Sequence, residues 1–66
     1  MIINFYFGCS FVGIVYYMTI SGVNINLGSF SSNENEAKSE AIQILKQNYK
    51  LDYKEEDITF MWDGTL

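Results

Sequence analysis

The side chains that could take part in covalent or acid–base chemistry are few in this chain. It has 66 residues, with a single cysteine, Cys9, and no histidine or arginine. A thiol or hydroxyl nucleophile usually depends on a neighbouring base, and a reactive thiol on a nearby cation. The sequence around Cys9 supplies neither. We therefore expect Cys9 to be a small buried packing residue, and we expect no catalytic residue and no cofactor site.

Carboxylates are the other reactive groups, and Glu55, Glu56 and Asp57 follow one another directly. Such a run could hold a hard cation, but it lacks the alternating oxygen ligands and the glycine of a calcium loop. A zinc or haem site would need histidines or further cysteines. The spacing of the glycines does not match a phosphate-binding loop. We expect a solvated connector here and no metal.

The acidic residues have a second possible use, which is binding. Eight acids against four lysines give a net charge of −4, which disfavours contact with nucleic acid. Most of these acids could form a negative face that fits a basic groove on another protein. The alternative is that they only keep the chain soluble. The candidate face comprises Glu34, Glu36, Glu40, Glu55, Glu56 and Asp57.

The first half of the chain is predicted to be rich in strands, which form the framework of the fold. Residues 23–27 alternate apolar and polar side chains, and residues 11–20 are rich in aromatic and β-branched types. Ser21 and Gly22 lie between the two runs as a two-residue hairpin turn. Pairing Ile20 with Val23 places apolar residues of both strands on one face. The same register pairs Met18 with Ile25, Tyr16 with Leu27, and Ile14 with Ser29.

The remaining elements are a first strand, a helix and a last strand. Residues 2–7 predict a strand, with residues 8–10 as a turn or bulge. Asn33, with Glu36 three residues later, predicts the start of a helix from about residue 34 to about residue 49. A charged connector over residues 52–57 leads to a strand over residues 58–62. The helix should bury one side, comprising Ala37, Ala41, Ile44, Leu45 and Asn48.

These elements predict a single α+β domain over residues 1–66, with a small antiparallel sheet in the order β-β-β-α-β and one helix on one face. Trp62 should lie in the core with Ile58 and Phe60. A core this small, with no disulfide, favours self-association. The uncovered face should bind a second copy, through sheet faces or edges, or another partner. Its expected interface residues are Tyr6, Val15, Tyr17 and Met61.

The uncharged first half also permits a membrane hypothesis. Residues 2–20 carry no charge and are long enough to cross a bilayer, with an acidic soluble tail after them. Polar side chains inside this stretch and the lack of a basic residue near it argue against a span or a signal peptide. We expect a cytoplasmic protein, with the single-span membrane protein as the alternative. An enzyme that uses Cys9 or paired carboxylates is the third.

The C-terminal two thirds resembles, in general layout, small accessory proteins of bacteriophages that infect low-GC hosts. The resemblance rests on residues 28–30 ending a strand, on residues 32–37 opening a helix that continues through Ala41 and Leu45, and on residues 57–60. Some proteins of this kind block host defence systems, so the resemblance implies an inhibitor of a host protein. Together with the missing catalytic groups, it predicts a non-enzymatic, homodimeric protein-binding module.

Overall fold

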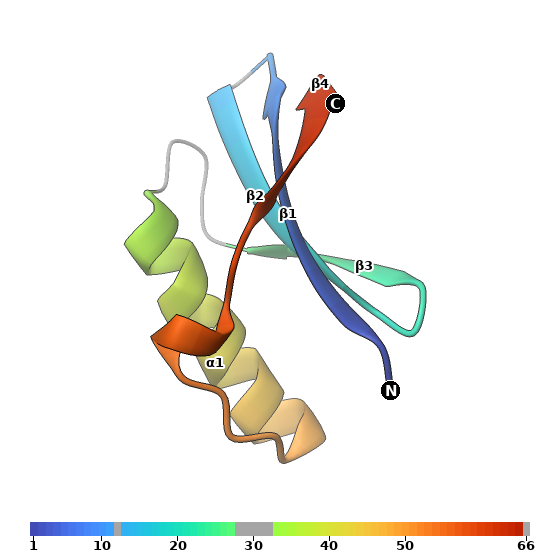
Figure 1. The fold of residues 1–66 in the computed structure, drawn as a ribbon, viewed down its shortest axis with the longest axis vertical. Coiled ribbons are helices and arrows are strands. Elements are labelled where there is room, and N and C mark those ends of the chain that lie inside the picture. Colours follow the sequence, from blue (N-terminus) through green and yellow to red (C-terminus); the bar gives the residue numbers. More distant parts are fainter. Residues whose placement is uncertain (12, 28–32, 66) are drawn as a thin grey trace.

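Three strands, one helix and a fourth strand follow one another along the chain and form two layers (Figure 1). The computed structural model describes residues 1–11, 13–27 and 33–65. A four-stranded sheet in the order β3-β2-β1-β4 packs on one face against a 16-residue α-helix, which confirms the α+β fold and the predicted order of elements. The elements are β1 (Ile3–Ser10), β2 (Gly13–Ile20), β3 (Val23–Leu27), α1 (Glu34–Tyr49), the 3₁₀ turn η1 (Glu55–Asp57) and β4 (Met61–Thr65).

The β2–β3 hairpin has the predicted turn and register. Ser21 and Gly22 both have positive φ, at 50° and 88°. This is the backbone that lets a two-residue turn follow the twist of its strands. Ile20 pairs with Val23, Met18 with Ile25 and Tyr16 with Leu27. The predicted partner of Ile14, Ser29, lies outside the described residues, as does the strand end at residues 28–30.

Strand β1 is longer than the sequence indicated. Residues 8–10, predicted as a turn or bulge, continue the strand and pair with residues 13–15 of β2. The turn follows at Phe11 instead. On its other side β1 does show an irregularity, because its register against β4 shifts between Phe7 and Cys9. Gly8 therefore marks a change of register at one edge, as a bulge does, while the β2 ladder continues unbroken.

Helix α1 begins and ends as its sequence predicts. The Asn33 side chain accepts a hydrogen bond from the Glu36 amide at 2.8 Å, and this satisfies a free amide of the first turn. At the other end Lys50 has φ of 58°, and the Leu51 amide donates to the Leu45 carbonyl. The helix buries Ala37, Ala41 and Leu45 completely. Asn48, which we expected on this side, is exposed.

The last strand corrects the expectation of an antiparallel sheet. β4 runs parallel to β1, with Tyr6 opposite Met61 and Phe7 opposite Trp62. The reason is the helical crossover: α1 carries the chain back along the sheet, so the next strand runs in the direction of β3, which is also that of β1. The sheet is therefore mixed. The strand also begins later than predicted, at Met61, and η1 occupies part of the connector before it.

The core lies between α1 and one face of the sheet. Phe5 of β1 is at its centre, with the rings of Phe60 and Tyr53 at centroid distances of 5.9 and 6.2 Å. The buried apolar residues are Phe5, Met18, Ile20, Leu27, Ala37, Ala41, Leu45, Ile58 and Phe60. Two of them are alanines, so the helix approaches the sheet closely and the core is small.

Trp62 does not belong to this core, in contrast to our expectation. It lies on the same sheet face as Phe7, whose ring it meets at a centroid distance of 5.3 Å, but it is 58% exposed. The upper end of the sheet in Figure 1 extends beyond α1. The predicted alternation of side chains between the two faces was correct, but α1 does not extend far enough along the sheet to cover Trp62.

The segment considered as a membrane span is not a single helix. Most of residues 2–20 lie in β1 and β2, which pair with each other. Within the described ranges, no helix is long and apolar enough to cross a membrane.

Candidate functional site

The sheet face opposite α1, called the far face below, brings together the four residues predicted as an interface. Tyr6 pairs with Tyr17 on one side and with Met61 on the other, so these three side chains form a row across three strands. Val15 pairs with Gly8, one position along the same face. Met61 is 47% exposed and the other three are partly exposed. The register thus assembles one patch, which we call the tyrosine patch.

The two tyrosines of this patch hold each other and the last strand in place. Their ring centroids lie 5.3 Å apart with a tilt of 31°. The Tyr17 hydroxyl donates a hydrogen bond to the Asp63 carboxylate of β4, so a side chain of β2 reaches across β1 to the edge strand. Sequence reasoning missed Asp63, because the contact depends on the parallel placement of β4. Aromatic rings fixed in this way lose little entropy on binding a partner.

The hydrogen bond to Asp63 also changes the acidity of Tyr17. It favours the neutral phenol and, with smaller effects of desolvation and of the nearby negative charge, raises the pKa of Tyr17 from 10.0 to about 12. A folded-state pKa above the unfolded value means that the folded chain holds this proton more tightly. The contribution to stability is therefore complete below pH 10 and is lost as the pH rises towards 12.

We expect wild-type protein to lose more stability than the Tyr17→Phe variant between pH 10 and pH 12. The variant lacks the hydroxyl whose proton is linked to folding. Urea unfolding followed by circular dichroism, at several pH values, measures the difference. Equal losses in the two proteins would show that the contact with Asp63 does not persist in solution.

A second aromatic group lies on the opposite side of the sheet, where Trp62 is exposed and the other two rings are partly buried against the core. It consists of Trp62 and Phe7, with the Tyr16 ring 5.9 Å from that of Phe7. Sequence reasoning missed it because Trp62 was assigned to the core. The projecting end of the sheet therefore exposes aromatic surface on both faces.

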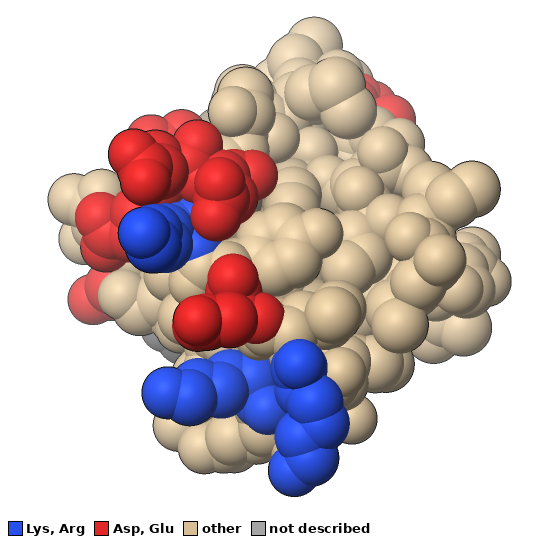
Figure 2. Space-filling model, turned by 60° about the horizontal axis from the view of Figure 1, so that its bottom comes forward, with Lys and Arg blue, Asp and Glu red and all other residues tan. Residues whose placement is uncertain are grey.

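The acidic residues predicted as a binding face fall into two groups. Glu34, Glu36 and Glu40 lie on the first half of α1, and the other three form η1, which contacts the helix. Figure 2 shows acidic side chains gathered on one side of the molecule, with lysines beside them and uncharged surface over most of the rest of the view. Some of these acids have partners within the chain. Lys38 Nζ lies 3.9 Å from Glu34 Oε2, and the Asp57 carboxylate accepts a hydrogen bond from the Lys54 amide.

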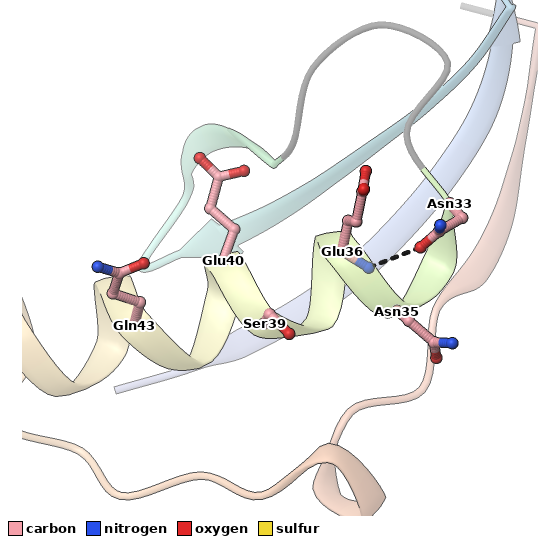
Figure 3. A pocket seen from close by; sticks show the side chains of 6 residues that line it. All are labelled: Asn33, Asn35, Glu36, Ser39, Glu40 and Gln43. Atoms are coloured by element: carbon pink, nitrogen blue, oxygen red, sulfur yellow. Dashed lines mark hydrogen bonds between the residues drawn. The ribbon is translucent and has the colours of Figure 1, made fainter.

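A hollow of about 490 Å³ lies along the first three turns of α1 (Figure 3). Among the described residues, those that line it lie on the helix and its cap and have polar side chains, and the Glu36 and Glu40 side chains extend from the same flank. The lining residues are Asn33, Asn35, Glu36, Ser39, Glu40 and Gln43. These groups can accept and donate hydrogen bonds, but they include no histidine or cysteine and therefore no pair of base and strong nucleophile.

Cys9 lies exposed on β1, opposite Ile14, and so is not the buried packing residue that we expected. Its thiol is 4.0 Å from the carbonyl oxygen of Ser10. In the described part of the chain, no three potential metal ligands cluster together.

Comparisons with models of protein families, with curated proteins and with solved structures found no match for this chain.

Proposed function

We propose that this protein is a non-enzymatic protein-binding module that acts as a homodimer and inhibits a host protein by covering part of its surface. The observation that carries the proposal is the tyrosine patch: two tyrosines with their rings in contact and an exposed methionine, on a sheet face that no element of the described chain covers. Tyrosine and methionine are enriched at protein interfaces, and tyrosine is among the commonest hot-spot residues.

The charge distribution supports the same function. The tyrosine patch contains no charged side chain, and its nearest carboxylate, Asp63, is held by the Tyr17 hydroxyl. The remaining acids lie on α1, on η1 and just before η1. An apolar contact surface with acidic groups elsewhere would fit a target that combines an apolar patch with a basic region, since complementary charge speeds encounter and selects the partner.

The resemblance to small phage accessory proteins supports the choice of target class. A phage or prophage inhibitor acts in the cytoplasm of its host and blocks a host protein, such as a component of a defence system, without chemistry of its own. A chain with no catalytic groupings and a compact, uncovered aromatic surface meets those requirements.

Replacing Tyr17 with glutamate tests the proposal. A carboxylate at this position removes an aromatic ring from the patch and adds a charge that must be desolvated on binding, so the variant should lose the host protein that wild type retains. The measurement is a parallel pull-down from lysates of low-GC bacteria with wild type, Tyr17→Glu and a control variant, each first shown to be folded by circular dichroism.

Gln47→Glu is the matched control. Gln47 is exposed on α1, outside both the tyrosine patch and the β3 edge. The control carries the same added charge and should retain the bound protein. If Tyr17→Glu retains the same protein as wild type, the far face is not the binding surface.

A further inference from the structure

The two edges of the sheet differ in how well they are protected from pairing with another chain. Natural sheets protect free edges with charged residues, proline, bulges or irregular backbone. The β4 edge carries Asp63, a glycine at φ of 87° (Gly64) and the register shift against β1. The β3 edge has the sequence Val-Asn-Ile-Asn-Leu, with no charge, no proline and regular pairing to β2.

The backbone groups that point away from the sheet at the β3 edge can be identified from the register. Ile20 and Val23 close the two-residue turn and form its first hydrogen-bonded pair. Because hydrogen-bonded and non-bonded pairs alternate, Ile25 also bonds to β2, whereas the amides and carbonyls of Asn24 and Asn26 point outward. Within the described ranges these outward groups have no backbone partner.

The β3 edge is complementary to itself. When two copies are placed antiparallel about a two-fold axis at Ile25, Asn24 lies opposite Asn26 of the other copy, and Val23 opposite Leu27. In each Asn24–Asn26 pair, the backbone amide and carbonyl of both residues point toward the other strand. Each pair can therefore form two backbone hydrogen bonds. Apolar side chains meet on the helix side and asparagines on the far side, and no charges are placed opposite each other.

The surroundings of β3 extend this contact. Helix α1 packs against β2 and β3, so the two-fold axis brings both helices onto the same face of the joined sheet. Val23, which is 62% exposed, would be covered by the second copy. The assembly would stop at two chains, because both β3 edges are then used and the β4 edges remain protected.

We propose that a second copy of this chain docks at the β3 edge and forms a continuous eight-stranded sheet. The inference rests on the proposed function, which includes a homodimer, and it names the contact that forms it. Both tyrosine patches then lie on one face of the joined sheet and are free for the host protein. The sequence expectation of a self-interface at the tyrosine patch is the competing arrangement.

Hydrogen exchange of the native protein tests the contact without any substitution. The Asn24 and Asn26 amides should exchange at least about tenfold more slowly at a protein concentration where the dimer dominates than where the monomer does, and the exposed Gln47 amide inside α1 should change much less. Nuclear magnetic resonance resolves these amides individually. A dimer whose Asn24 and Asn26 amides exchange as fast as in the monomer would overturn the proposal.

Two substitutions at Asn26 distinguish a dimer contact at the β3 edge from a dimer contact on the far face. Asn26→Pro removes an outward donor from each copy and places a ring in the seam, while the β2 ladder keeps its bonds. We expect the dissociation constant of the dimer, measured by sedimentation equilibrium, to rise about 30-fold or more. Asn26→Ala keeps the backbone donor and should change the dissociation constant of the dimer by less than about threefold.

The Tyr17→Glu variant distinguishes failure of this inference from failure of the proposed function. If Tyr17→Glu dissociates the dimer and Asn26→Pro does not, the second copy binds at the tyrosine patch, and the edge proposal is wrong. If wild-type protein is a monomer at all concentrations, both the edge contact and the homodimer are wrong. The pull-down with Tyr17→Glu tests binding of the host protein separately in either case.

Discussion

Replacing Phe60 with alanine should destabilise the fold by about 4 kcal/mol. Phe60 is 8% exposed and packs edge-on against two rings, with centroids 5.9 Å from Phe5 and 4.9 Å from Tyr16. The substitution would leave a cavity in the core beside Phe5 and remove both aromatic contacts. A domain of this size has only a few kcal/mol of stability in total, so the variant should be largely unfolded at 25 °C.

Trp62→Ala is the control for Phe60→Ala. Trp62 lies two residues further along on the same side of the sheet but is 58% exposed, so its loss should cost about 1 kcal/mol or less. Urea unfolding followed by circular dichroism compares the variants, since Trp62 is the single tryptophan and its fluorescence is lost in the control. Equal destabilisation would mean that α1 or another element covers Trp62 in solution.

The Leu45→Ala variant should lose about 3 kcal/mol. Leu45 is completely buried on α1, where it lies one turn beyond Ala41 and is the largest of the three fully buried helix side chains. The neighbouring alanines cannot fill the cavity, so the sheet and helix would have to approach each other to close it. Thermal unfolding in parallel with Gln43→Ala gives the comparison.

Gln43→Ala places the same residue on the exposed side of α1, where alanine is a good helix former, so its melting temperature should stay within a few degrees of wild type. If Leu45→Ala melts at the same temperature as this control, the helix does not pack on the sheet through Ala37, Ala41 and Leu45.

The features set by local sequence were predictable. The hairpin register followed from a short turn and the strict alternation of residues 23–27, which allow only one pairing with all apolar residues on one face. The helix followed from Asn33, whose side chain caps it, and from alanines and leucine at helical spacing. The tyrosine patch followed from the same alternation, because residues of one parity share a face whatever lies beyond the sheet.

The largest errors concern the last strand and what covers it. Periodicity predicts the sheet face on which Trp62 lies. It does not predict how far the helix on that face extends, and α1 does not reach Trp62. The direction of β4 depends on where the helix returns the chain, which no local pattern records. The Tyr17–Asp63 contact depends on that direction, so it could not have been found from the sequence.

The parallel pairing of β1 with β4 has a consequence for the order of folding. It joins Tyr6 to Met61, which are 55 positions apart, whereas the β2–β3 hairpin closes over two residues. Hairpins form within microseconds, and contacts between distant residues must await closure of a long loop. Docking of β4 is therefore the late event, and loss of Phe60 should accelerate unfolding more than it slows folding. The edge that forms last is also the one that carries Asp63 and Gly64, which protect it from other chains while it is still undocked.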